Sequence, residues 1–137
     1  MKKAVLFTAG IIGLISLISQ LSAQSTPQFF AGTGHWYQVV TSPNVTWTQA
    51  KAAATAAGGY LACINSQAEN NFVLGLTPPP PATWIGGSDQ VTEGNWQWVS
   101  GEAWSFTNWG SDEPSSGGGL VDEDYLEMWT AIGHPTL

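Results

Sequence analysis

Positive charge and cysteine are scarce in this chain. Its 137 residues contain three lysines, no arginine and one cysteine, against ten aspartates and glutamates, and the formal net charge is -7. Proteins bind nucleic-acid phosphates and anionic membranes with clustered Lys and Arg, so nucleic acid is excluded as a partner and an anionic membrane is disfavoured. With Cys63 alone no internal disulfide can form, and a small domain must then depend on its core or on a metal.

The first 23 residues have the pattern of a secretory signal peptide. Lys2 and Lys3 give a cationic start, Ala4 to Leu21 is almost wholly apolar, and Ala23 supplies a small residue at the exit. An uncleaved membrane anchor is the alternative, because the apolar run nearly reaches the roughly 20 residues that a span requires. The pattern predicts a secreted, cell-surface or periplasmic protein, with residues 24–34 as a linker and 35–137 as one domain.

Turn and capping residues divide that domain into a mixture of helices and strands. Thr46 to Gln49 and Ser66 to Glu69 have the spacing of capping boxes, which predicts helices near 47–57 and 67–75. The alternation in 95–99, with Trp96 and Trp98 on one face, predicts a half-buried strand. Further strands are expected near 35–40, 60–64, 84–86 and 125–129, and residues 100–122 are expected to form a long irregular loop. The predicted fold class is α+β.

Acidic residues are concentrated in the second half of the chain. All ten except Glu69 lie between Trp84 and Trp129, a stretch without lysine or arginine. Loop carboxylates with no cation beside them repel one another, and a hard divalent cation with oxygen ligands relieves that repulsion. An acidic, solvated surface is the alternative explanation.

Six short motifs, in this order and spacing, resemble the C-type lectin-like domain. They are WTQAK (47–51), GGYLA (58–62), INSQAEN (64–70), WIGG (84–87), EGNWQW (93–98) and NWGSDEP (108–114). The resemblance runs from about His35 to Trp129. It implies two helices that flank a mostly antiparallel sheet, with a long irregular loop that binds calcium.

The resemblance also implies which residues bind the ligands. Glu113, a cis Pro114 and Glu123 match the family's primary calcium site, where sugar hydroxyls complete the shell of the ion. The carbohydrate-binding candidates are therefore Glu113, Ser115 and Glu123. Asp89, Glu93 and Asp124 match a second, auxiliary calcium site, although Asp89 and Glu93 could equally be ordinary turn residues.

The chain departs from the family in four respects. Ser115 stands where sugar-binding members have Asn, and a hydroxyl is the shorter and weaker calcium ligand. The loop from Pro114 to Glu123 is about two residues longer than in well-known members, so Ser116 or Asp122 could substitute as a ligand.

Ala54 and Tyr125 occupy positions where the family usually has bridging cysteines, a pattern that looks bacterial. The sequence stops at Leu137 before the expected Trp-Asn-Asp strand, so we interpret it as a fragment in which the strand 35–40 is an exposed edge.

Two binding functions compete, and an enzyme is the weakest hypothesis. The first is an exported, calcium-dependent carbohydrate-binding module. The second is a lectin-like fold used for protein binding, adhesion or surface display without sugar or calcium. The sequence contains no Ser-His-Asp or Cys-His arrangement, and Cys63 lies within a predicted strand, where it is expected to be a buried apolar residue. We therefore predict no catalytic residues.

Overall fold

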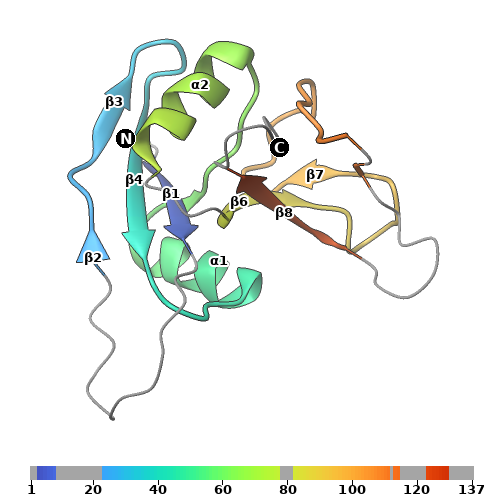
Figure 1. Cartoon of the computed structure of the whole chain (residues 1–137), viewed down its shortest axis with the longest axis horizontal. Helices are drawn as coiled ribbons and strands as arrows, with labels where there is room; N and C mark the ends of the chain where they lie inside the picture. The colour runs from blue at the N-terminus through green and yellow to red at the C-terminus, as the bar shows by residue number, and fades with distance from the viewer. Residues whose placement is uncertain (1–2, 9–22, 78–81, 112, 115–122, 130–137) are drawn as a thin grey trace.

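The protein is an α+β domain in which two helices flank one mixed sheet. The computed structural model describes residues 3–8, 23–77, 82–111, 113–114 and 123–129. In Figure 1, α1 and α2 lie beside β1 and β4, while β6, β7 and β8 form the other end of the molecule. The elements are β1 (Lys3–Thr8), β2 (Ala23–Gln24), β3 (Gln28–Phe30), β4 (His35–Thr41), α1 (Trp47–Ala56), β5 (Tyr60–Leu61), α2 (Gln67–Leu76), β6 (Ala82–Ser88), β7 (Gln97–Trp98) and β8 (Tyr125–Trp129).

The predicted helix starts are confirmed, although one of the two capping boxes is only half formed. At α1 the Gln49 amide donates to the Thr46 hydroxyl at 3.3 Å, and the Thr46 amide donates to the Gln49 side chain at 3.0 Å. At α2 the Glu69 amide donates to Ser66 Oγ at 3.2 Å. The Glu69 carboxylate does not return to its cap, because it accepts hydrogen bonds from Tyr37 and from the Asn65 amide instead.

The N-terminal segment forms the centre of the sheet. β1 runs parallel to β4 from Lys3 opposite Trp36 to Thr8 opposite Thr41, and it also pairs with β5 and β6. Ala4, Val5 and Leu6 are 1%, 1% and 0% exposed. In the uncleaved chain these residues therefore form a strand of the core. Cleavage of residues 1–23 as a signal peptide stays a prediction.

In the uncleaved chain the strand 35–40 and the neighbouring segment 24–34 pair with other strands, whereas the predicted exposed edge concerned residues 24–137 alone. Residues 24–34 do not form a free linker, because β2 and β3 both pair antiparallel with β4, and the Ser25 amide donates to the Val39 carbonyl at 2.8 Å. β4 is also not an exposed edge, since β1 covers its other side. These short strands are interrupted by Pro27 and lack a period-two pattern, so the sequence carried no strand signal for them.

The sheet separates two layers of core. Tyr37 and Val39 of β4 pack with Val73 and the half-buried Phe72 of α2 in one hydrophobic cluster. Val40, the next residue on the strand, packs on the other side with Trp47, Ala50 and Ala54 of α1. This follows from the alternation of side chains along a strand. No helix within the described ranges is both long enough and apolar enough to cross a membrane.

Indoles packed against one another hold the long loop onto the end of the sheet. Trp104 lies with its ring centroid 4.4 Å from Trp98 and 5.9 Å from Trp96, and Trp109 lies 5.2 Å from Trp96. The described part of the loop, residues 100–111 and 113–114, contains no helix or strand, as predicted. Its shape is therefore maintained by aromatic contacts instead of by a backbone ladder.

Candidate functional site

The turn that follows β6 brings two acidic residues together. The Asp89 carbonyl accepts the Thr92 amide at 2.9 Å, and Asp89 Oδ2 accepts the Gly94 amide at 2.9 Å. Gly94 has a φ of 74°, in the left-handed region that favours glycine. This closed turn folds Glu93 back toward Asp89, so the four-residue spacing seen in the sequence becomes a spatial contact.

Strand pairing adds a third acidic residue. β8 lies antiparallel to β6 with Tyr125 opposite Ser88, and the Asp89 amide donates to the Asp124 carbonyl at 3.2 Å. Asp89, Glu93 and Asp124 each present a carboxylate oxygen, and these three oxygens lie within 4.8 Å of one another. Within the described residues this is the one group of three or more acidic, histidine or cysteine side chains close enough to share an ion.

The burial of Asp89 distinguishes this cluster from a solvated acidic surface. Asp89 is 4% exposed, and its Oδ1 is buried with no hydrogen-bond partner among the described residues. A buried carboxylate oxygen without a partner costs free energy unless a cation or a hydrogen-bond donor satisfies it. The donor set consists of oxygens alone and carries up to three negative charges, which fits calcium or another hard divalent cation.

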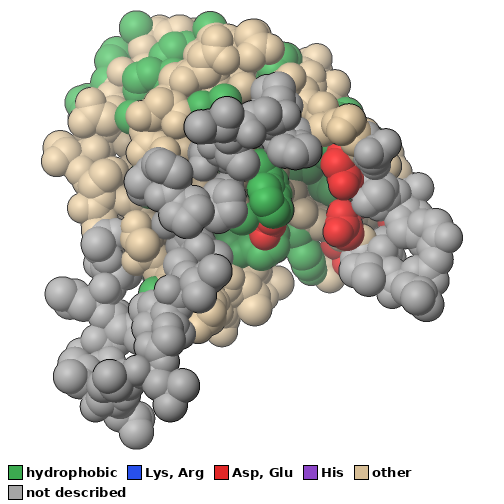
Figure 2. Space-filling view, in the orientation of Figure 1, with side chains coloured by type: hydrophobic (Ala, Val, Ile, Leu, Met, Phe, Trp, Pro, Cys, Tyr) green, Lys and Arg blue, Asp and Glu red, His purple; other side chains and the backbone are tan. Residues whose placement is uncertain are grey.

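The surrounding surface offers little positive charge to compensate these carboxylates. Lys51 is the only lysine after Lys3, and the chain has no arginine. Figure 2 shows acidic side chains grouped in the region that β8 occupies in Figure 1, with no lysine or arginine visible beside them. Because like charges at this spacing repel, the region should have a net affinity for cations.

The predicted primary site is only partly within the described residues. Glu113 and Pro114 are exposed, the bond between them is cis as the resemblance implied, and the Glu113 amide donates to the Gly110 carbonyl at 3.2 Å. Glu123 is exposed and begins the segment that leads into β8. Ser115 lies outside the described residues. Neither Glu113 nor Glu123 belongs to the cluster of Asp89, Glu93 and Asp124.

Sequence reasoning did not single out Glu127, which lies on β8 opposite Trp84. Burial raises the pKa of this carboxyl, and the charge of Glu123 acts in the same direction, while a hydrogen bond from Trp129 opposes the shift. The period-two pattern of β8 could have placed Glu127 on the same face as Tyr125 and Trp129. It could not have revealed the burial, which depends on packing against β6.

A second polar network, also missed by sequence reasoning, lies at the other end of the sheet. Glu69 is 1% exposed and accepts hydrogen bonds from the Tyr37 hydroxyl and, at 2.7 Å, from the Asn65 amide. The Asn65 side chain donates to Glu102 at 2.9 Å, and His35 Nε2 lies 3.9 Å from the same carboxylate. These partners connect β4, α2 and the long loop, so their role is structural.

The buried thiol has no catalytic character. Cys63 is 2% exposed, and its Sγ lies 3.4 Å from the Leu61 carbonyl oxygen, which can accept a weak hydrogen bond. Burial raises the pKa of this thiol to about 12. A nucleophilic cysteine requires the thiolate at neutral pH and access to substrate, and Cys63 has neither.

Comparison with known proteins identifies the family. The model of the "Lectin C-type domain" matches residues 43–126, more than half of the chain. The galactose-specific lectin nattectin of Thalassophryne nattereri is 30% identical over 113 residues, which cover 80% of this chain and 71% of that protein.

Two solved structures share the fold. One is the cow C-type carbohydrate-recognition domain of CD23, crystallised in the presence of a GlcNAc2Man3 oligosaccharide, with a TM-score of 0.57 and 28% identity. The other is a calcium-independent type II antifreeze protein, with a TM-score of 0.56 and 28% identity. This chain covers 64% and 62% of them, and 63% of its own length is matched in each case. The relatives are binding proteins and not enzymes. The chain belongs to the C-type lectin domain family.

Proposed function

We propose that this protein is an exported, non-catalytic carbohydrate-binding module that depends on calcium. One observation carries the proposal: Asp89, Glu93 and Asp124 converge within 4.8 Å, and Asp89 has a buried oxygen without a partner. Calcium bound there would satisfy that oxygen and remove the repulsion among the three carboxylates. These three residues form the proposed auxiliary calcium site.

Glu113 and Glu123 are the proposed primary calcium ligands, with Ser115 as a further sugar contact. Both glutamates are exposed, so a bound ion could take vicinal sugar hydroxyls into its remaining coordination positions. The galactose-specific lectin and the CD23 domain crystallised with an oligosaccharide support carbohydrate or a glycoconjugate as the ligand class. The ligand groups would be oxygens throughout, and the calcium ion would supply a Lewis-acidic centre that orients them.

The second candidate function is protein binding, adhesion or surface display without sugar or calcium. The similarity to a calcium-independent antifreeze protein favours it, because that protein uses this fold without the ion. Ser115 in the place of Asn points in the same direction, since it weakens the primary site. We propose export through the predicted signal peptide in either case, to the cell surface, the periplasm or the medium.

Thermal unfolding of the full chain, in calcium and in EDTA, separates the two functions. A ligand at 100 times its dissociation constant stabilises the folded state by about 2.7 kcal/mol, so calcium should raise the melting temperature measurably. Asp89→Asn should remove most of that increase. Glu102→Gln is the matched control, because it removes a carboxylate charge outside the cluster and retains an acceptor for Asn65.

Sugar binding is measured on a glycan array, with two variants at the proposed primary site and with the same control. Glu113→Gln and Glu123→Gln should abolish calcium-dependent glycan binding, while Glu102→Gln should leave it intact. A melting temperature that is identical in calcium and EDTA for the wild type, with glycan binding unaffected by EDTA, would contradict the calcium proposal. If the wild-type protein in calcium binds no glycan on the array, the second function is favoured.

A further inference from the structure

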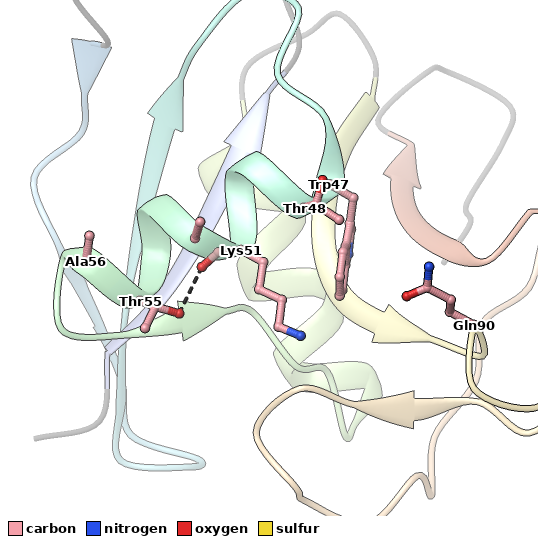
Figure 3. A pocket seen from close by; sticks show the side chains of 7 residues that line it. Trp47, Thr48, Lys51, Thr55, Ala56 and Gln90 are labelled. Carbon is pink, nitrogen blue, oxygen red and sulfur yellow. Dashed lines mark hydrogen bonds between the residues drawn. The ribbon is translucent and has the colours of Figure 1, made fainter.

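An open pocket of about 560 Å³ lies against the outer side of α1. Figure 3 shows Lys51 extended alongside the Trp47 ring, with Gln90 facing this ring from the opposite wall. Gln90 belongs to the turn after β6, so two elements distant in sequence form the walls. The lining residues are Trp47, Thr48, Lys51, Ala52, Thr55, Ala56 and Gln90.

Lys51 gives this pocket the one lysine or arginine charge in the sequence after residue 3. Its Nζ lies 5.1 Å from the centroid of the Trp47 ring. In the described part of the chain no carboxylate oxygen forms an ion pair with it. A cation–π contact orients the ammonium group but leaves its N–H donors available, so Lys51 can still bind an anion.

The rest of the lining suits a sugar ring. Thr55 donates its hydroxyl to the Lys51 carbonyl at 2.9 Å, so its oxygen remains available as an acceptor, while the exposed Gln90 offers both a donor and an acceptor. Ala52 and Ala56 add apolar contact area. Trp47 is 4% exposed and therefore forms the floor and not a stacking platform. A few oriented polar groups on an apolar base are typical of small-molecule pockets.

We propose that this pocket binds a carboxylate-bearing sugar, such as a uronic acid residue of a glycan, with Lys51 pairing the carboxylate and Gln90 contacting ring hydroxyls. The inference shares the carbohydrate class with the proposed function but needs no metal ion. A chain of net charge -7 repels a polyanion, whereas a single carboxylate is screened beyond about 8–10 Å at physiological salt. A monoanionic sugar therefore fits better than nucleic acid or a sulfated polymer.

Isothermal titration of the full chain tests the pocket with two matched probes. Methyl β-glucuronide carries the carboxylate, and methyl β-glucoside has the same ring without it. The glucuronide should bind about tenfold more tightly, the effect of one charge-assisted hydrogen bond of about 1.4 kcal/mol. Lys51→Met should remove this preference and leave glucoside binding unchanged, and Lys51→Arg should retain part of it.

Gln90→Met should weaken both probes, because the amide contacts hydroxyls that the two sugars share. Gln97→Met is its control, since Gln97 is an exposed glutamine on β7 and does not line the pocket. Equal affinity for the two probes, or glucuronide binding unaffected by Lys51→Met, overturns the proposal.

Two further measurements, one in EDTA and one on the variant Glu113→Gln, distinguish sugar bound in the Lys51 pocket from sugar bound at the proposed calcium loop. Glucuronide binding that survives both changes but is lost in Lys51→Met supports the pocket, whatever calcium does elsewhere. Glucuronide binding that EDTA and Glu113→Gln abolish, and that Lys51→Met leaves intact, places the sugar at the calcium loop and overturns the pocket. The proposed function would stand in that case.

Discussion

The indole of Trp47 stacks on the ring of Tyr125, with centroids 4.5 Å apart and planes inclined by 22°. The same indole donates its Nε1 hydrogen to the Ile85 carbonyl at 2.7 Å. One side chain of α1 is thus attached to both β6 and β8. Since Asp124 directly precedes Tyr125, this contact also positions the strand end that brings Asp124 to Asp89.

Replacing Tyr125 by leucine tests that coupling. The change keeps an apolar side chain but removes the stacked pair, which is worth about 0.5–1.5 kcal/mol beyond its buried area. The free energy of unfolding, measured by urea denaturation, should fall by about that amount. The increase in melting temperature on adding calcium should also shrink. A calcium response identical to that of the wild type would show that the stack does not position Asp124.

Two tyrosines with buried hydroxyl groups, Tyr37 and the half-buried Tyr60, provide a matched pair for measuring one hydrogen bond. Burial and the adjoining Glu69 carboxylate raise the pKa of Tyr37, and burial raises the pKa of Tyr60 to about 12. Tyr37 donates to Glu69, whereas the Tyr60 hydroxyl has no hydrogen-bond partner in the described part of the chain. Tyr37→Phe should therefore cost about 1.5–3 kcal/mol in urea unfolding, and Tyr60→Phe should be neutral or stabilising.

The double variant Tyr37→Phe, Glu69→Gln completes this test. Removing the charge of Glu69 lowers the cost of losing the Tyr37 hydroxyl, so the two changes should be less than additive. Strict additivity in the double-mutant cycle would mean that the two side chains do not interact.

Glu127 should make the protein less stable as the pH rises. Because the folded state raises its pKa above the ordinary value of 4.5, the folded state holds the proton more tightly than the unfolded chain. Its contribution is fully present below pH 4.5 and is lost as the pH rises through the folded pKa. In EDTA, Glu127→Gln should match the wild type at low pH and melt at a higher temperature at neutral pH. A lower melting temperature for the variant at neutral pH would refute this assignment.

Leu6→Ala tests whether β1 packs in the sheet as described. Leu6 is 0% exposed, and a leucine-to-alanine change at such a site costs about 2–5 kcal/mol. Val91→Ala is the control, because Val91 is 87% exposed and its truncation should change the free energy of unfolding little. Equal unfolding of wild type and Leu6→Ala would show that residues 3–8 are absent from the folded core. In that case mass spectrometry of the expressed protein would test the predicted cleavage after residue 23.

Local sequence signals were sufficient for the helices and for most of the strands from β4 onward, but not for β1, β2 and β3. Thr46 and Ser66 cap α1 and α2 at the predicted positions, because a hydroxyl that accepts an amide hydrogen acts within one turn of the chain. The irregular loop after β7 was predicted from its Gly, Ser and Trp content. The short strands β2 and β3 were not, since strands of two or three residues have no period to detect and exist only through β4.

By itself the sequence determined the class of the fold and the acidic character of the region between Trp84 and Trp129, because capping, periodicity and charge are properties of neighbouring residues. The resemblance named Asp89, Glu93 and Asp124 as one group, but only the tertiary structure brings their carboxylates together. It buried Asp89, joined it to Asp124 through the pairing of β6 with β8, and turned the Glu69 carboxylate from its cap toward Tyr37. Each of these contacts joins residues more than 30 positions apart, and strand register and packing decide such contacts, not local sequence.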